Sequence, residues 1–307
     1  MRSSTVTISL FLSLGILFSA CQSQTTGLPL PGTVQNTPAP SPTPADSGGA
    51  SASEEGIREI NPLPPDPLEI SFFSKDGFPL QGKFYPGAEV DLPVVVLMHW
   101  YPGDQGDWEE IAYWLQNRGM TGIRRGVPWL DPSWFPALPP ETSYNVLTFT
   151  FRDCEGGCSQ LAAEDWLEDA AASLKAARSL QGVNPDQVIA IGASIGADAA
   201  VSSCAAALNE DPQDCLGALS LSPGNYLGES YAEQVNRLES SRPPRPAWCM
   251  YDQEEPEAAV CETASGKLYQ KQSWQGGNLH GMHLLTSTLD PLPLQRIVDF
   301  LNQVTEP

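Results

Sequence analysis

The segment Val188–Ala200 constrains the fold more than any other part of the chain. It begins with an apolar run, ends in small residues, and holds Gly192-Ala-Ser-Ile-Gly196 between them. A serine on a sharp turn between a strand and a helix leaves no room for Cβ atoms two residues to either side, and glycine supplies that room. The turn raises the Ser194 hydroxyl above the sheet edge and puts the Ile195 amide at a helix N-terminus, where it can donate to a developing negative charge. The spacing therefore predicts a nucleophilic serine at position 194.

The flanking sequence favours this interpretation of a short motif made of common residues. Gln187–Ile191 is short, apolar and β-branched, as expected for a strand that is covered on both faces of a parallel sheet. Ala197–Leu208 is rich in alanine and predicts a helix that packs close to that sheet. The alternative is a tight strand-to-helix turn whose serine has no chemical role.

Strand and helix patterns alternate along the rest of the chain. An antiparallel hairpin is predicted first, because Leu68–Ser74 and Pro79–Tyr85 flank an Asp-Gly turn. Asn184–Gln187 is predicted to turn the chain into the serine strand. The other predicted strands are Leu92–His99, Asn145–Phe151, Leu216–Leu221, Pro246–Tyr251 and Leu268–Trp274, and the other predicted helices are Trp108–Asn117, Ala162–Leu180, Tyr231–Leu238, Glu257–Ser265 and Leu294–Val304. This alternation predicts an α/β fold with a mostly parallel central sheet, helices on both faces and the antiparallel hairpin at its start.

The N-terminal part of the chain predicts export. Residues 1–20 hold Arg2, an apolar run too short to span a bilayer and small residues before Cys21, which is the pattern of a signal peptide. Phe18-Ser-Ala-Cys21 resembles a bacterial lipobox, so we expect Cys21 to be lipid-modified and to hold the protein on the outside of a bacterial membrane. Ordinary secretion is the alternative. Residues 21–66 are expected to be a disordered tether rich in Ser, Thr and Pro, and residues 67–307 a single domain.

Six cysteines remain after Cys21, and an exported protein is expected to oxidise them. Proximity in the sequence predicts three disulfides, although six cysteines allow other connectivities. Metal binding is the rival interpretation, but no Cys-x-x-Cys pair or histidine cluster supports it. The predicted pairs are Cys154 with Cys158, Cys204 with Cys215, and Cys249 with Cys261.

A nucleophilic serine needs a base, and the chain has only three histidines. His99 ends a predicted strand, which favours a structural role. His280 and His283 lie between the last predicted strand and the last helix, so they follow the serine as a base does in enzymes with this turn.

The acid that orients such a base is expected after the preceding strand. Tyr251-Asp-Gln-Glu-Glu-Pro256 offers Asp252, Glu254 and Glu255 just past that strand. Clustered acids in a loop are more often solvated, and the residues alone leave the choice among the three open.

The serine turn and three further motifs resemble the α/β-hydrolase superfamily, in particular its dienelactone-hydrolase-like and carboxylesterase branch, over about Leu68–Val304. The resemblance gives Ser194 the role of nucleophile. His99-Trp-Tyr-Pro102 is similar to the family's His-Gly-x-Pro loop, which implies that the amides of Tyr101 and Ile195 form an oxyanion hole. Trp100 stands where the family has glycine.

The two remaining motifs concern the acid and the base. Asp252-Gln-Glu-Glu-Pro256 resembles the family's Gly-x-x-Asp-Pro loop, which implies Glu255 as the catalytic acid and Asp252 as its alternative. The His-Gly motif of the family falls on His280, which implies this residue as the base and His283 as the alternative. A disulfide between Cys249 and Cys261 would fix the loop that carries Glu255.

Pro128–Pro136 carries two tryptophans and a phenylalanine among prolines. This segment is either a surface loop packed by its own aromatic side chains or an apolar wall of a binding cleft.

Together these features predict an exported serine hydrolase that cleaves esters of small molecules through an acyl-enzyme. A serine peptidase of the same fold and a non-catalytic binding lipoprotein are the alternatives. The net charge of −21 argues against nucleic acid or an anionic membrane surface as a partner. We expect no metal or organic cofactor, membrane contact only through the lipid anchor, and a monomer.

Overall fold

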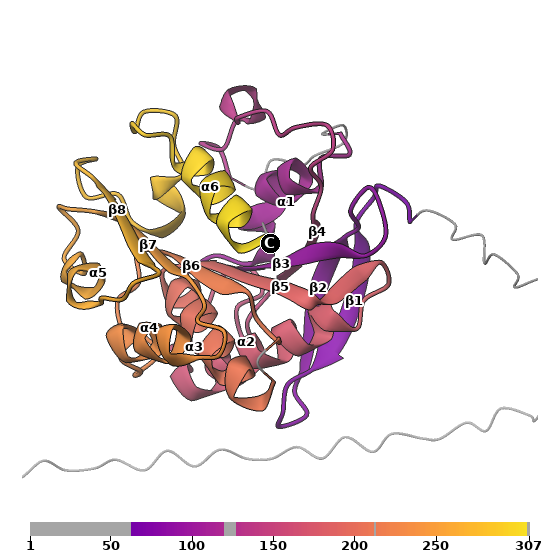
Figure 1. Ribbon diagram of the computed structural model, residues 1–307, viewed down its shortest axis with the longest axis horizontal. Helices are drawn as coiled ribbons and strands as arrows, with labels where there is room; N and C mark the ends of the chain where they lie inside the picture. Colours follow the sequence, from indigo (N-terminus) through magenta and orange to yellow (C-terminus); the bar gives the residue numbers. More distant parts are fainter. Residues whose placement is uncertain (1–62, 120–126, 212, 306–307) are drawn as a thin grey trace, which may run out of the picture. The chain divides into compact units, whose positions relative to one another are not determined.

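The computed structural model describes residues 63–119, 127–211 and 213–305 (Figure 1). The predicted signal peptide, Cys21 and the tether up to residue 62 lie outside these residues. Within the described ranges, none of the helices has both the length and the apolar character needed to cross a membrane.

The described residues form one eight-stranded sheet in the order β1-β2-β4-β3-β5-β6-β7-β8. β1 pairs antiparallel with β2, and β2 pairs antiparallel with β4, while every other neighbouring pair is parallel. The strands are β1 (Leu68–Phe73), β2 (Pro79–Tyr85), β3 (Leu92–Met98), β4 (Asn145–Phe149), β5 (Val183–Ala193), β6 (Gly217–Leu221), β7 (Ala247–Asp252) and β8 (Tyr269–Trp274). The predicted hairpin and mostly parallel sheet are confirmed.

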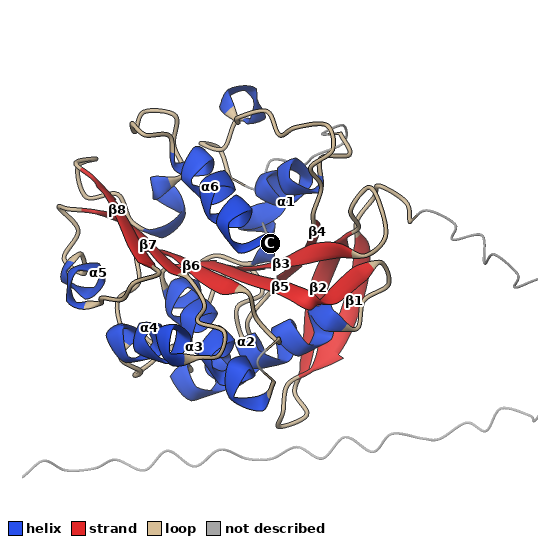
Figure 2. Ribbon diagram, in the orientation of Figure 1, coloured by secondary structure: helices blue, strands red, loops and turns tan. Residues whose placement is uncertain are grey.

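Helices cover both faces of this sheet (Figure 2). α1 (Glu109–Gln116) and α6 (Pro293–Thr305) lie on one face, and α2 (Ala163–Arg178), α3 (Ile195–Glu210), α4 (Tyr231–Ser240) and the short α5 (Ala259–Thr263) lie on the other. Three short 3-10 helices, Gln105–Trp108, Pro132–Trp134 and Gly281–Leu284, occur in the connections.

The alternation of side chains along β5 explains the two layers. Val188 and Ala190 pack into the core with α2 and α3, whereas Ile189 and Ile191 pack into the core with α1 and α6. Side chains on both faces of the strand are buried, which explains why residues 188–191 are all apolar.

One predicted boundary is wrong. The sequence predicts that Asn184–Gln187 is a turn before the serine strand, but β5 begins at Val183. The pairing with β3 jumps from Leu92↔Val183 to Val94↔Val188, so residues 184–187 bulge out of a strand that has already started. The Asp186 amide donates to the Asn184 side chain at 3.1 Å, which is the local turn that the sequence pattern detected.

The structure contains the three disulfides expected from proximity, Cys154–Cys158, Cys204–Cys215 and Cys249–Cys261. The second joins α3 to the residue that leads into β6, and the third joins β7 to α5. All six cysteines are buried in the layer that holds α2, α3 and α4.

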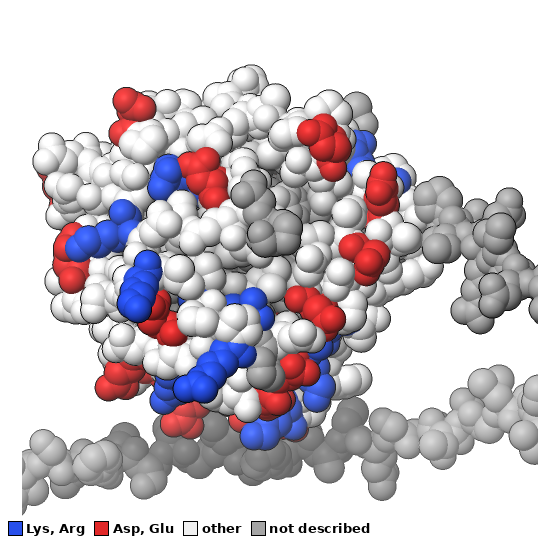
Figure 3. Space-filling view, viewed as in Figure 1, with Lys and Arg blue, Asp and Glu red and all other residues white. Residues whose placement is uncertain are grey.

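Charged side chains of both signs are interspersed on the face shown in Figure 3. Ion pairs among the described residues include Arg296 with Asp299 at 2.6 Å and Lys271 with Glu262. Such exposed pairs contribute about 0–1 kcal/mol each, so the fold depends on its two apolar layers.

Candidate active site

Ser194 lies on the turn between β5 and α3 in a strained conformation. Its φ of 52° and ψ of −116° lie where side chains other than glycine are rarely found. The Ser194 amide donates to the Leu221 carbonyl at 2.8 Å, which holds the turn against the end of β6. A Cβ on Gly192 would lie 1.9 Å from the Gly196 carbonyl oxygen, and one on Gly196 would lie 2.3 Å from the Met98 carbonyl oxygen. Both glycines are therefore required by the close approach of the backbone.

The structure brings a histidine and a carboxylate to this serine. His280 Nε2 lies 2.9 Å from Ser194 Oγ, and His280 Nδ1 lies 3.5 Å from Glu255 Oε2. Glu255 is buried, with 3% of its surface exposed. The three side chains come from the turn after β5, the turn after β7 and the loop after β8, because the carboxyl ends of parallel strands meet at one edge of the sheet.

Asp252, the alternative acid, has a different position. It is fully buried at the end of β7 and accepts hydrogen bonds from the amides of Gly276 at 3.0 Å, Leu279 at 2.9 Å and Glu254 at 3.0 Å. These bonds fix the turn that presents Glu255 and the loop that presents His280.

His283, the alternative base, lies three residues beyond His280 between two indoles. Its ring centroid is 4.8 Å from that of Trp100 and 4.4 Å from that of Trp129. Desolvation by these neighbours and repulsion from His280 hold the pKa of His283 below its usual value, which favours the neutral ring.

Ser222 is a residue that the sequence did not single out. It directly follows β6, is fully buried and has a positive φ of 54°. Its hydroxyl donates to Glu255 Oε2 at 2.8 Å and accepts from the Gly281 amide at 3.0 Å. One hydroxyl thus joins the acid to the residue next to His280. The only signal in the sequence is a polar residue just after a buried strand.

His99 has a structural environment, as its place at a strand end predicted. It is fully buried, its Nε2 accepts from the Phe151 amide at 3.0 Å, and its Nδ1 donates to the Trp100 carbonyl at 2.8 Å. Burial lowers the pKa of His99 to about 4, so the ring is neutral at physiological pH.

The loop after β3 carries the predicted oxyanion amide of Tyr101. The Trp100 carbonyl accepts hydrogen bonds from His99 and from the Gly103 amide at 2.9 Å. The Trp100 carbonyl and the Tyr101 N–H belong to the same peptide unit, so these two bonds fix the orientation of the Tyr101 N–H. The second predicted amide, that of Ile195, opens α3, where the first-turn N–H groups have no partner within the helix.

A second loop packs against this one from the end of β4. A Cβ on Gly157 would lie 2.9 Å from the Pro102 carbonyl oxygen, and Cys158 Sγ lies 3.9 Å from the Gly103 carbonyl oxygen. The Cys154–Cys158 disulfide closes this second loop.

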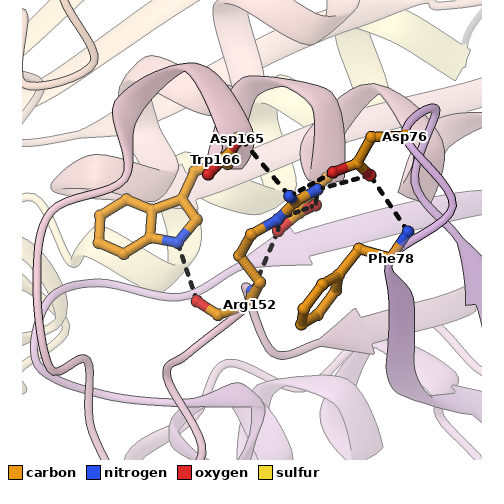
Figure 4. A network of polar contacts seen from close by, with 6 residues as sticks. Asp76, Phe78, Arg152, Asp165 and Trp166 are labelled. Carbon is orange, nitrogen blue, oxygen red and sulfur yellow. Dashed lines mark hydrogen bonds and ion pairs between the residues drawn. The ribbon is translucent and has the colours of Figure 1, made fainter.

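Arg152 anchors the start of the second loop (Figure 4). Its buried guanidinium donates to Asp169 on α2 at 2.7 Å and to Asp76 in the β1–β2 turn at 2.7 Å, and it lies 4.7 Å above the centre of the Phe78 ring. The Arg152 hydrogen bonds lower the pKa of Asp76 to about 2. The network joins the hairpin and α2 to the loop that supports Pro102 and Gly103.

The aromatic side chains of the segment Pro128–Pro136 contact two different parts of the molecule. Trp129 lies against His283, and its indole N–H donates to the Met282 carbonyl at 3.3 Å. Phe135 packs instead on Trp114 of α1, with ring centroids 5.8 Å apart.

Comparison with known proteins adds the fold family. The sequence matches no protein-family model and no curated protein. Solved structures that resemble it include an esterase from Pyrococcus furiosus (TM-score 0.54, 13% identity, 78% of this chain and 93% of that chain) and the alpha/beta hydrolase GrgF from Penicillium (TM-score 0.54, 14% identity, 79% and 99%). A dienelactone hydrolase from Anabaena variabilis is also similar (TM-score 0.51, 13% identity, 78% and 96%).

The chain has the α/β-hydrolase fold. In this hydrolase fold the turn after β5, the turn after β7 and the loop after β8 supply the three candidate residues. Among the residues that the structure describes, no three His, Cys, Asp or Glu side chains are grouped so that they could bind a metal ion.

Proposed function

We propose that this protein is a serine hydrolase that cleaves carboxylic esters. The observation that carries the proposal is the series Ser194 Oγ to His280 Nε2 at 2.9 Å and His280 Nδ1 to Glu255 Oε2 at 3.5 Å. A nucleophile, a base within hydrogen-bond reach and an acid behind the base are the parts that acyl transfer requires. Esterases among the similar structures favour an ester as the substrate.

The reaction begins when His280 Nε2 takes the proton from the Ser194 hydroxyl, whose oxygen attacks the ester carbonyl carbon. The carbonyl oxygen becomes an oxyanion, which accepts hydrogen bonds from the Ile195 and Tyr101 amides. The tetrahedral intermediate collapses, and the protonated His280 gives its proton to the departing alkoxide, so an alcohol leaves and Ser194 is acylated.

Water completes the cycle. His280 removes a proton from water as its oxygen attacks the acyl carbon, and the proton then passes to Ser194 Oγ as the carboxylic acid is released. Glu255 holds the imidazole in place and stabilises its positive charge in both halves of the reaction.

A substrate panel with matched variants tests this function. Wild type should hydrolyse p-nitrophenyl acetate and butyrate, and Ser194→Ala and His280→Gln should lose at least about 1,000-fold in kcat, since the removed groups act as a unit. Ser220→Ala is the control, because Ser220 is also a buried serine at the same sheet edge but donates to the Ala197 carbonyl at 2.9 Å. Turnover of peptide p-nitroanilides instead of esters would favour the peptidase, and a folded wild type without turnover of either would favour the binding protein.

We also propose that the protein is exported and anchored through Cys21. Three disulfides within the domain support an oxidising compartment. Radiolabelled palmitate should enter the wild type in bacteria and not Cys21→Ser, and globomycin should block processing. Secretion of an unlabelled wild type would contradict the anchor.

A further inference from the structure

An aromatic wall stands beside the candidate nucleophile, formed by the side chains of Trp100, Trp129 and His283. Trp100 occupies the position next to the predicted oxyanion amide of Tyr101. A Cβ on Gly281 would lie 2.9 Å from Trp100 Cε3 and 3.6 Å from Ser194 Cβ, so the first indole of the wall lies within a few ångströms of Ser194. His283 packs against Trp100, and Trp129 packs against His283, so the wall continues through both rings.

Hydrogen bonds fix the wall in place. The Trp100 indole N–H donates to Asp107 at 2.7 Å, and the Trp129 indole N–H donates to the Met282 carbonyl at 3.3 Å. The two indole rings lie edge to face, with centroids 6.1 Å apart and an interplanar angle of 77°. Three separate segments therefore meet in one rigid arrangement.

The same bonds decide what the wall can recognise. Both indole donors are already used, so the wall presents ring surfaces to a ligand and no indole N–H. His283 is exposed, and its ring stands at 86° to Trp100 and 51° to Trp129. Rings held at such angles pack well against another flat ring, since edge-to-face contacts match the positive edge of one ring to the negative face of the next.

We propose that the aromatic wall of Trp100, Trp129 and His283 binds a flat aromatic ring of the substrate, so that the enzyme prefers aryl-bearing esters. This inference rests on the proposed ester hydrolysis and adds the substrate class. The ring is carried by either the acyl or the alcohol part, and the experiment separates the two.

Two matched pairs of esters test the inference. Methyl phenylacetate is compared with methyl cyclohexylacetate for the acyl side, and benzyl acetate with cyclohexylmethyl acetate for the alcohol side. Each pair keeps a six-membered ring and replaces a flat ring with π electrons by a bulkier saturated ring. Hydrolysis is followed by pH-stat, and each kcat/KM is divided by the rate of hydroxide-catalysed hydrolysis of that ester to remove intrinsic reactivity.

The wild type should prefer the aromatic member of at least one pair by about three- to tenfold, which corresponds to the usual strength of an aromatic contact beyond its buried area. His283→Leu and Trp129→Leu should remove that preference, because kcat/KM for the aromatic ester should fall more than kcat/KM for the cyclohexyl ester. His283 is exposed, so its replacement is the variant least able to disturb folding. Trp134→Leu is the control from the same segment, because Trp134 packs on Phe135 with ring centroids 4.9 Å apart.

Equal rates within both pairs would overturn the inference while the proposed function stands, and so would equal losses on aromatic and cyclohexyl esters in both variants. A wild type that hydrolyses p-nitrophenyl acetate but none of the four esters would overturn this inference alone. A wild type that hydrolyses none of these five esters would overturn the proposed function and this inference with it.

Discussion

Replacing Ser222 by alanine tests how the acid and the base are held together. The Ser222 hydroxyl donates to the same Glu255 oxygen that faces His280, and it accepts from the Gly281 amide. A hydrogen bond to a charged group contributes about 1.5–3 kcal/mol. If the variant loses this amount only in the transition state, kcat falls by about 10- to 150-fold. KM should change little, because Ser222 is fully buried and does not reach the substrate.

The assay measures kcat, KM and Tm for wild type, Ser222→Ala and Ser220→Ala on one ester. Ser220→Ala removes a buried serine hydroxyl from the same strand end without touching Glu255. Its kcat should stay within about threefold of wild type, since the hydrogen bonds that it loses, with Ala197 and Tyr231, involve no charged group. The reasoning fails if Ser222→Ala retains wild-type kcat, or if both variants lose kcat in proportion to their loss of Tm.

Further predictions separate the roles of the other buried polar groups. Glu255→Gln should lower kcat by at least about 100-fold with little change in the free energy of unfolding. Asp252→Ala should lower the free energy of unfolding by about 3 kcal/mol, because three backbone amides lose their acceptor. Urea unfolding and kcat of both variants check these predictions, and the opposite result would exchange the roles of the two acids. Burial lowers the pKa of His99 to about 4, so the unfolded chain binds more protons below pH 6.5 and the free energy of unfolding should fall by about 3 kcal/mol as the pH drops from 6.5 to 4. Burial raises the pKa of Asp198 to about 6, so protonation of Asp198 raises the free energy of unfolding as the pH falls and opposes the effect of His99. The test is therefore the difference between wild type and His99→Gln in how the free energy of unfolding depends on pH. Parallel curves for the two proteins would contradict the prediction.

Much of the fold follows from local patterns. The apolar run of β5, the two glycines around Ser194 and the alanines of α3 each favour the structure that the whole chain adopts, and the Asp-Gly turn favours the hairpin. The early start of β5 was missed because the pairing of Val183 with Leu92 depends on a strand far away in the sequence. The turn-forming residues Asn184–Gln187 directly follow Val183, so the local sequence predicts a turn there and gives no sign of the pairing.

The candidate site follows from the sequence only in its order along the chain. Serine, acid and histidine lie at successive strand ends, and strand ends can be predicted. The residues alone leave the choice between Asp252 and Glu255 open, and only the family resemblance favours Glu255. The choice depends on backbone amides of a distant loop that take Asp252 as their acceptor. Ser222 was missed for a similar reason, since its contacts join segments that only the tertiary structure brings together. The sequence offers Trp129 as part of a cleft wall, but its contacts with Met282 and His283 also depend on the tertiary structure.

Labelling of the intact protein by a fluorophosphonate probe tests the central claim most directly, because the probe reacts only with an activated serine. Peptide mapping of the folded wild type should find one adduct, on Ser194, and Ser194→Ala should take up none. A folded wild type that never reacts, or an adduct that persists in Ser194→Ala, would contradict the assignment of Ser194, His280 and Glu255 to one catalytic site.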